Sequence, residues 1–546
     1  MSENSLSEYN GLTIYECIKS KAEEYKDLTA LEYYGNKISY TSLIADIDRC
    51  ASAMYLYGVR QGMHVAVILP NIPQAVFIFY ACSKLGAVCD LIHPLSSVRE
   101  LKSYIDMTNP KIVFVYDELP AGITVLSGKV QKAVLVSPSE YLPKMAKLAF
   151  KMKAGVKNPS FIRFETFPEF FKEGTKPFAY KEDDLPVASD PCAMLYTGGT
   201  TGKAKGVLLS SFNFNNNAEE AIESCECLRK GDRFLAELPI FHGFGLGVCV
   251  HTVLMYGGTS ILLPVFKVKK FAQLISKYKP AVIAGVPAIF GAIVSGDSKD
   301  IDMSFVKLVI SGGDKLPSDI QDKMNEILAS HGSKAVVRQG YGLTECLSGV
   351  CLMPPGCKEH NCIGRPYRNT RFKIVDPETG RELPNGTNGE ILISGPSVMV
   401  GYYNEPEENH DTLKIDDGVV WLRTGDMGRI GDNGLLYFEC RIKRMIITNG
   451  YNVYPGVLED IIRSCPGVAD CAVIGVPDEL RGEVVLAYIV FDKDIDTDSA
   501  LKTVKEEMNL SVSKFAVPRS FVVLDEIPRT KLGKVDIKAL EEYKQE

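Results

Sequence analysis

Residues 196–206 read Tyr-Thr-Gly-Gly-Thr-Thr-Gly-Lys-Ala-Lys-Gly, and they follow a short apolar run, 192–195, that predicts a buried strand. The glycines of this stretch allow a tight turn and close approach of the backbone, and its threonines supply hydroxyl groups. Exposed backbone N–H groups beside the ammonium groups of its lysines form a cradle for phosphate oxygens. A plain surface turn rarely combines all three ingredients. The stretch therefore predicts a phosphate-binding loop.

This loop differs from the commonest phosphate loop. A Walker A motif places glycine, four residues and then Gly-Lys-Ser/Thr in sequence, with the last hydroxyl on magnesium. Here Ala204 follows Gly202 and Lys203, and Thr197 stands where the first glycine should be. The pattern argues against a P-loop ATPase or GTPase.

The composition is that of an ordinary globular protein. A chain of 546 residues is too long for one core, and 46% hydrophobic with 24% charged residues is typical of soluble domains. The formal net charge of −7 argues against a nucleic-acid-binding protein. No apolar run approaches the roughly 20 residues of a membrane helix. The polar start of the chain, 1–5, does not resemble a signal peptide, so we expect a cytoplasmic protein without a membrane span.

Strand-like and helix-like segments alternate from residue 12 to about residue 432, which argues for an α/β fold with helix-covered, largely parallel sheets. The expected buried strands include 65–69, 111–115, 134–136, 281–285 and 308–310, and an expected helix covers 74–85. Residues 371–393 instead predict an antiparallel hairpin or a small barrel. After the turn-rich 431–434, a smaller α+β unit of about a hundred residues is expected.

Further motifs appear in a fixed order along the chain. They are Ser311–Pro317 (Ser-Gly-Gly-Asp-Lys-Leu-Pro), Gln339–Glu345 (Gln-Gly-Tyr-Gly-Leu-Thr-Glu), Thr424-Gly425-Asp426, Arg441, and Pro528–Lys534 (Pro-Arg-Thr-Lys-Leu-Gly-Lys). Together with the loop at 196–206, these motifs resemble those of the adenylate-forming (AMP-binding) enzymes. The resemblance covers nearly the whole chain and is greatest to the branch of acyl-CoA synthetases, 4-coumarate–CoA ligases and luciferases.

The resemblance implies two domains. Residues 1–440 would form the large α/β domain with a small β-barrel-like subdomain, and 441–546 a small, mobile α+β domain. The chain departs from the family pattern at Gly198, where a hydroxyl is usual, and at Ala204, where proline is common. It also has Asp314 and Lys315 where the family more often has Ala-Pro, which affects the expected shape of that turn.

The resemblance assigns many matched residues to ATP and CoA. The phosphate loop would use Thr197, Gly198, Gly199, Thr200, Thr201 and Lys205. The adenylate would contact Gly313, Gln339, Gly340, Tyr341, Thr344, Asp426 and Arg441. A hard magnesium ion prefers oxygen ligands, so Glu345 would hold the Mg²⁺ of ATP. Lys443 occupies the family's hinge position, and Asn449 and Gly450 would line the path of the CoA thiol.

Three residues are expected to act in the chemistry. Attack of a carboxylate on the α-phosphate concentrates negative charge, which a positioned ammonium group stabilises in the transition state. By resemblance this group belongs to Lys534, assisted by Thr344 and Glu345. Without the family match, Lys534 would be one more lysine of a basic tail.

Residues 238–246 (Leu-Pro-Ile-Phe-His-Gly-Phe-Gly-Leu) resemble the segment that lines the acyl pocket. Amino-acid-activating relatives have an aspartate there, whereas this chain has His242 among apolar neighbours. Because an unpaired buried ammonium group is costly, an acid without an α-amine is favoured. The substrate pocket is expected to use His242 as a gate, with Phe244, Leu246, Val286, Gly312 and Gly340, and to accept a fatty or aryl group.

These features predict an AMP-forming acid–thiol ligase that uses ATP, Mg²⁺ and coenzyme A. A carrier protein's phosphopantetheine arm stays open as the alternative acceptor. A regulator that binds nucleotide without catalysis is disfavoured, because Lys205, Glu345, Asp426, Arg441 and Lys534 are all present.

The 15 cysteines are scattered and predict reduced, mostly buried thiols. One group, Cys346, Cys351, Cys357, His360 and Cys362, could bind a metal. It lacks the paired Cys-x-x-Cys spacing of structural zinc, so the metal site is the weaker interpretation.

Overall fold

The structure is a computed structural model. It describes residues 9, 11–117, 119, 130, 132–153, 164–175, 186–197, 204–264, 268–296, 301–448, 451–478, 480–493, 495–530 and 534–543. The predicted phosphate-loop residues Gly198, Gly199, Thr200 and Thr201 and the predicted CoA residues Asn449 and Gly450 lie outside these ranges.

The first sheet has the order β19-β9-β8-β4-β3-β5-β6-β7, and its strands from β8 to β7 are parallel. The strands are β3 (His64–Ile68), β4 (Val88–Leu91), β5 (Ile112–Tyr116), β6 (Ala133–Val136), β7 (Glu165–Thr166), β8 (Pro191–Thr197), β9 (Lys205–Ser210) and β19 (Gly401–Tyr402). Continuous apolar runs such as that of β3 suit parallel strands that are covered on both faces. The strands predicted at 65–69, 111–115, 134–136 and 192–195 are confirmed.

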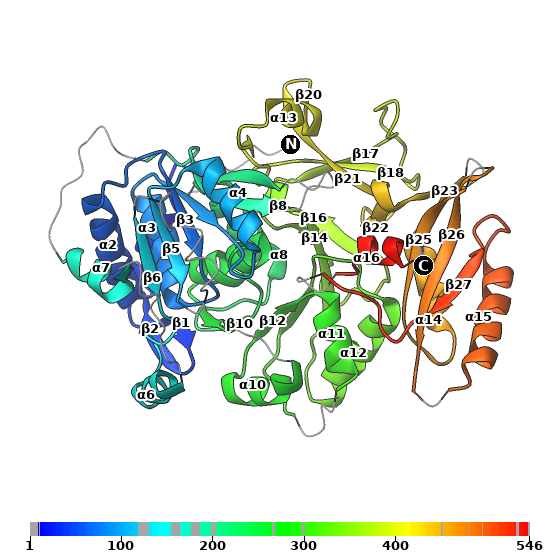
Figure 1. Ribbon diagram of the computed structural model, residues 1–546, viewed down its shortest axis with the longest axis horizontal. Helices are drawn as coiled ribbons and strands as arrows, with labels where there is room; N and C mark the ends of the chain where they lie inside the picture. The colour runs from blue at the N-terminus through cyan, green and yellow to red at the C-terminus, as the bar shows by residue number, and fades with distance from the viewer. Residues whose placement is uncertain are drawn as a thin grey trace.

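Helices cover this sheet and fill the space toward the second one (Figure 1). They are α1 (Ile14–Glu24), α2 (Tyr40–Leu56), α3 (Pro73–Lys84), α4 (Val98–Thr108), α7 (Phe167–Glu173) and α8 (Ser211–Cys225), whereas α6 (Lys144–Lys153) lies below β1 and β2 in this view. Sequence signals start several of them: Thr13 and Glu16 form a capping box at α1, and Ser97 and Glu100 form one at α4. Pro73 begins the predicted helix α3, whose residues up to Ser83 are all buried.

The second sheet has the order β17-β18-β21-β22-β16-β15-β14-β13-β12-β10-β11-β1-β2, with β20 paired to β21. Its strands are β1 (Thr29–Tyr33), β2 (Asn36–Ser39), β10 (Arg233–Ala236), β11 (Thr259–Leu262), β12 (Val282–Gly285), β13 (Leu308–Ser311), β14 (Val337–Gly342), β15 (Gly349–Leu352), β16 (Cys362–Pro366), β17 (Arg371–Val375), β18 (Gly389–Ser394), β20 (Leu413–Asp416), β21 (Val419–Ile430) and β22 (Leu436–Arg441). Strands β1 and β10 to β14 are parallel, and β14 to β18 are antiparallel. The predicted hairpin at 371–393 is β17 with β18.

The helices of this half connect or cover its strands. They are η2 (Phe244–Thr252), α9 (Val253–Met255), η3 (Val268–Lys270), α10 (Phe271–Tyr278), α11 (Pro287–Val294), α12 (Ser318–Ser330), η4 (Thr344–Cys346) and α13 (Pro406–Thr412). The largest buried apolar cluster draws residues from both sheets and from α1, α2, α3, α8 and η2, so one core joins the two halves.

The C-terminal unit has a sheet of its own, β24-β23-β26-β25, with β27 paired to β26 (Figure 1). Its elements are β23 (Ile446–Thr448), β24 (Tyr451–Val453), α14 (Pro455–Ser464), β25 (Val468–Asp478), β26 (Gly482–Phe491), α15 (Thr497–Ser511), β27 (Ser520–Val523) and α16 (Ile537–Glu542). Its two buried clusters contain only residues between 446 and 540. The turn η5 (Ile442–Arg444) follows β22, so we propose to keep the division at residue 440.

Within the described residues, no helix is both long enough and apolar enough to span a membrane.

Candidate active site

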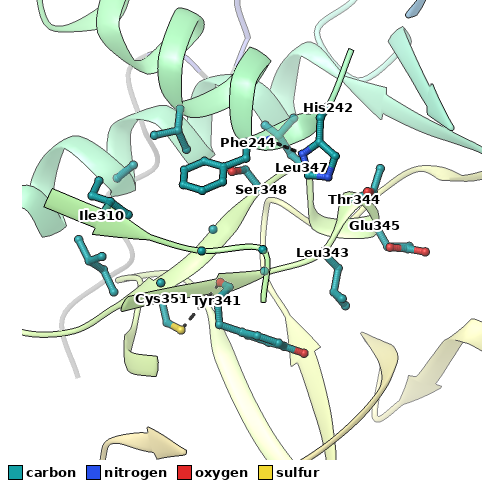
Figure 2. Close-up of a pocket in the computed structure, with 18 of the residues that line it drawn as sticks. His242, Phe244, Ile310, Tyr341, Leu343, Thr344, Glu345, Leu347, Ser348 and Cys351 are labelled. Carbon is teal, nitrogen blue, oxygen red and sulfur yellow. Dashed lines mark hydrogen bonds between the residues drawn. The ribbon is translucent and has the colours of Figure 1, made fainter. Parts of the chain in front are cut away.

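A cavity of about 490 Å³ lies at the carboxyl ends of β8, β13 and β14, and side chains from four regions of the chain meet there (Figure 2). Crevices at the carboxyl ends of parallel strands are the usual binding sites of α/β sheets. The predicted residues that line it are Thr197, Lys205, His242, Phe244, Gly312, Gly313, Gly340, Tyr341, Thr344, Glu345, Arg441 and Lys534. Residues far apart in the sequence therefore share one cavity.

The segment 340–345 lines the cavity as the end of strand β14 followed by the single turn η4. At Gly342 the chain passes so close to β15 that an added Cβ would lie 1.6 Å from the carbonyl oxygen of Ser348. Only glycine allows this close approach. The chain beyond Gly342 then places Thr344 and Glu345 in the lining of the cavity (Figure 2).

Tyr341 and Asp426 are joined directly. The Tyr341 hydroxyl donates a hydrogen bond of 2.7 Å to Oδ2 of Asp426, and the tyrosine ring lies 6.1 Å from that of Phe438 between ring centres. A flat aromatic ring held in this way offers a stacking surface beside the carboxylate.

Asp426 and Arg441 face each other across β21 and β22, and Nε of Arg441 lies 2.9 Å from Oδ1 of Asp426. Burial raises the pKa of Asp426 to about 6, although Arg441 and the Tyr341 hydroxyl act in the opposite direction. Oδ1 contacts the guanidinium group without accepting a well-directed hydrogen bond. This buried oxygen suits a ligand hydroxyl, as a ribose would supply.

Glu345 and Lys205 meet through Tyr402, a residue that the sequence did not single out. The Tyr402 hydroxyl donates a 2.8 Å hydrogen bond to Oε1 of Glu345, and Nζ of Lys205 lies 5.1 Å from the centre of its ring. In this structure the Lys205 ammonium group is paired with Glu408 at 2.5 Å. Strand β19, which carries Tyr402, pairs with β9, so the sheet itself brings these groups together.

Glu345 and the adjacent Thr344 supply oxygen atoms of the kind that magnesium prefers. Among the described residues, no group of three or more His, Cys, Asp or Glu side chains could hold a metal ion by itself. Mg²⁺ commonly binds through one or two carboxylates and the phosphates of its substrate. The donor set therefore fits a magnesium ion that arrives with a nucleotide.

Beyond η5, Lys534 is the only predicted residue that the described part of the chain places in this cavity. Burial lowers the pKa of its ammonium group, as does Arg441, while the charges of Asp314 and Asp426 act in the opposite direction. A partly desolvated cation interacts more strongly with a charge that develops beside it.

His242 accepts a hydrogen bond from the backbone N–H of Phe244 at Nδ1, over 3.2 Å. Burial and then the charge of Lys534 lower the His242 pKa to about 4, so the ring is neutral near pH 7 with its proton on Nε2. His242 therefore presents a neutral donor between Lys534 and the apolar end of the cavity.

The apolar end of the cavity is deeper than the sequence predicted. It is lined by Ala221, Cys225, Leu228, Phe234, Val248 and Leu352. Phe244, Val248 and Thr252 share the π-helix η2, and their spacing of four residues could have identified the last two as lining residues. No acidic side chain is among the described residues at this end.

Two expected substrate residues lie elsewhere. Leu246 has no exposed surface and packs in the large core, because its side chain points from η2 away from the cavity. Val286 lines a second cavity of about 710 Å³ between α11, β22 and the C-terminal unit. The placement of Leu246 in the pocket wall is therefore not supported.

Three expected nucleotide residues within the described ranges do not line the first cavity. Asp426, described above, lines the second cavity. Gln339 is buried under the second cavity, where its Nε2 donates a 3.0 Å hydrogen bond to Oε1 of Gln321. Lys443 lies in η5, between the large domain and the C-terminal unit. The positions of Gln339 and Lys443 are compatible with structural roles beside the site.

The cysteine group separates in the structure. The Cys346 thiol lies against the carbonyl oxygens of Leu343 and Ser348, whereas Nε2 of His360 lies 3.0 Å from Asp322. The described residues offer no metal-binding group there. The metal interpretation of this group is not supported.

Comparison with known proteins agrees with this architecture. The family model described as "AMP-binding enzyme" matches residues 18–403, and that of the "AMP-binding enzyme C-terminal domain" matches 457–534. A long-chain-fatty-acid–CoA ligase of Bacillus subtilis is 30% identical over 96% of this chain and 93% of its own length. The 4-coumarate–CoA ligase 1 of Petroselinum crispum is 29% identical over 92% of this chain and 88% of its own.

Solved structures show the same fold. ATP-bound MatB from Rhodopseudomonas palustris is 28% identical and superposes with a TM-score of 0.84, over 98% of this chain and 99% of its own. The apo form of MatB covers the same shares of the two chains, with a TM-score of 0.76. The chain thus belongs to the AMP-binding enzymes, the adenylate-forming superfamily, as an acid–thiol ligase of the acyl-CoA synthetase and 4-coumarate–CoA ligase branch.

Proposed function

We propose that the protein is an ATP-dependent, AMP-forming ligase that activates a non-amino carboxylic acid, fatty or aryl, and transfers it to the thiol of CoA. One observation carries this proposal. A single cavity joins Lys534, Thr344 and Glu345 to a deep apolar end. A carboxylate seated with its chain in the apolar end would face the ammonium group of Lys534.

In the first half-reaction, a carboxylate oxygen of the acid attacks the α-phosphorus of ATP. The bond from that phosphorus to the bridging oxygen breaks, and pyrophosphate leaves. Lys534 stabilises the charge that gathers on the α-phosphate oxygens. Asp426 binds the ribose hydroxyls, Tyr341 stacks on the adenine and Thr197 and Lys205 contact the phosphates, while a magnesium ion at Glu345 would neutralise phosphate charge.

In the second half-reaction, the CoA sulfur attacks the acyl carbon, the thiol proton is lost, and AMP leaves with the former carboxylate oxygen. The thiol needs access to the acyl carbon from the side that Lys534 now covers. Rotation of the C-terminal unit about Lys443 would withdraw Lys534 and bring residues 449 and 450 to the cavity.

The cavity supports the choice of acid. Its described apolar end has no carboxylate to pair with an α-ammonium group, and burying such a group there would be costly. His242 is neutral and can donate to a carboxylate oxygen from Nε2. The named functions of the relatives, a fatty-acid ligase and a 4-coumarate ligase, span alkyl and aryl acids, and both classes suit this surface.

A screen of acid-dependent pyrophosphate release tests the proposal. Fatty and aryl acids should stimulate release, and α-amino acids of similar size should not. Product analysis with CoA and with phosphopantetheinylated carrier proteins identifies the acceptor. Stimulation by amino acids alone, or by no acid, would contradict the proposed function. The cytoplasmic location expected from the sequence stays a prediction.

A further inference from the structure

The turn after β13 carries Asp314 and Lys315. Gly313 opens this turn with a φ of +85°, and the backbone N–H of Lys315 donates a 2.9 Å hydrogen bond to the Asp314 carboxylate. The turn is thereby held in a shape that sends the Lys315 side chain across to the C-terminal unit.

Lys315 binds the first turns of helix α14 at two points. Its Nζ lies 2.8 Å from Oδ2 of Asp460 and donates a 3.2 Å hydrogen bond to the carbonyl oxygen of Gly456. The fit is close, because a Cβ at position 456 would lie 3.0 Å from the ammonium nitrogen. These contacts link the turn beside the nucleotide site to the unit that carries Lys534.

The surroundings of the pair favour a real energetic contribution. The side chains of Lys315 and Asp460 are only 15% and 26% exposed, whereas pairs in open solvent contribute little. Glu439 on β22 also faces Lys315, and the charge of Lys315 offsets the increase in the Glu439 pKa that burial causes. One ammonium group thus compensates two carboxylates and a carbonyl oxygen at the boundary.

We propose that Lys315 is a positioning residue for adenylation: its bond to Asp460 and Gly456 latches the C-terminal unit in the orientation that places Lys534 in the cavity. This inference rests on the proposed function. The latch holds the orientation used for the first half-reaction, and it has to open before the unit can rotate for the second.

Asp314 acts from the same turn. Its carboxylate lines the second cavity together with Lys534, and its charge raises the pKa of Lys534 against the effect of burial. Both residues therefore act on Lys534. Lys315 holds the C-terminal unit in place, and Asp314 favours the protonated form of Lys534.

The test is a charge swap across the boundary. Lys315→Glu and Asp460→Lys should each lower acid-dependent ATP–pyrophosphate exchange about 5- to 10-fold, because a bond worth about 1 kcal/mol is replaced by repulsion. The double variant Lys315→Glu/Asp460→Lys should recover part of the lost exchange, because the swap restores the pair between 315 and 460 but not the contacts with Glu439 and the Gly456 carbonyl oxygen. Thioester formation from preformed acyl-adenylate should not fall in any of them. Arg519→Ala, which breaks the Arg519–Asp478 pair inside the C-terminal unit, serves as the matched control and should leave exchange unchanged.

A second measurement does not depend on turnover. Hydrogen–deuterium exchange should accelerate in peptides from the start of α14 in Lys315→Glu, return toward wild type in the double variant, and stay unchanged in Arg519→Ala. The latch would be overturned if Lys315→Glu kept both the wild-type rate of adenylation and the wild-type protection of α14 from deuterium exchange. It would also be overturned if the double variant recovered neither the rate nor the protection. Absence of exchange activity in the wild type with every acid would instead contradict the proposed function, and the latch would then be judged by deuterium exchange alone.

Discussion

The hydroxyl of Tyr341 donates a 2.7 Å hydrogen bond to Oδ2 of Asp426, so the end of β14 is tied to the middle of β21. The bond fixes an aromatic ring that lines both cavities beside a buried carboxylate that lines the second one. Because Arg441 holds the other oxygen of Asp426 at 2.9 Å, the three side chains act as one unit. Their joint ligand is expected to be the adenosine half of ATP.

Binding of adenosine should weaken as the pH falls. Burial raises the Asp426 pKa to about 6, so below that pH the carboxyl is protonated and can no longer accept from both ribose hydroxyls. We expect the dissociation constant to rise about tenfold between pH 7 and pH 5. Adenosine is the ligand of choice because no phosphate of its own titrates in this range. Calorimetry at several pH values measures the effect.

Asp426→Asn is the companion variant. It should bind adenosine weakly at every pH and lose most of the pH dependence, since an amide does not titrate. Glu439→Gln removes a different, partly buried carboxyl, which lies on the neighbouring strand β22. This variant controls for a general loss of negative charge. An unaltered pH dependence in Asp426→Asn would show that another group is responsible.

Removal of the Lys534 ammonium group should separate the two half-reactions. Lys534→Ala should lower acid-dependent pyrophosphate release about 10²- to 10³-fold, because the charge on the attacked phosphate loses its nearest cation. Thioester formation from preformed acyl-adenylate should largely survive. Lys538→Ala, an exposed lysine on α16, should change neither rate. Equal loss of both half-reactions would falsify this division of labour.

The side chains that line the apolar end of the cavity should determine which length of acid the enzyme accepts. Val248→Phe adds volume inside the cavity, so the variant should favour shorter acids and lose activity on longer ones. Leu246→Ala should not change this preference, because Leu246 lies in the core, but it should lower the free energy of unfolding by about 2–5 kcal/mol. Competition between acids of different length and urea unfolding measure the two effects. A change of preference in Leu246→Ala would place that residue in the pocket after all.

Gly342 should not tolerate a side chain. A Cβ there would lie 1.6 Å from a backbone oxygen, so Gly342→Ala has to separate β14 from β15. We expect a loss of several kcal/mol, about 2–5, in the free energy of unfolding together with weaker nucleotide binding. Gly349→Ala, in the same hairpin, would place its Cβ 3.3 Å from the Tyr367 hydroxyl and no nearer than 4.0 Å to a backbone oxygen, so it should be much milder. Equal stability of the two variants would contradict the close approach at Gly342.

Local pattern was sufficient for much of the fold. The apolar run 65–69 and the helix-like spacing of 74–85 predicted β3 and α3, because a strand buried on both faces and a helix in the core each require such residues. The order of motifs likewise singled out Tyr341, Glu345 and Lys534, which the structure brings into one cavity, while their roles toward the nucleotide stay a prediction. The expectation for Leu246 came from its place in the motif at 238–246, whereas the structure buries this residue in the core, because a motif does not reveal that 244–252 forms a π-helix. The local pattern also passed over Tyr402, whose two-residue strand has no periodicity to detect.

What the sequence determined by itself is the family, the α/β class and the residue types of the site, since these depend on motifs and local periodicity. Only the tertiary structure decided that Lys534 shares a cavity with Glu345, that Asp426 is buried against Arg441 with its pKa raised to about 6, and that Lys315 reaches Asp460. The physical reason is that burial, charge pairing and the placement of one domain on another arise from contacts between residues far apart in the chain, which spacing along the sequence does not specify.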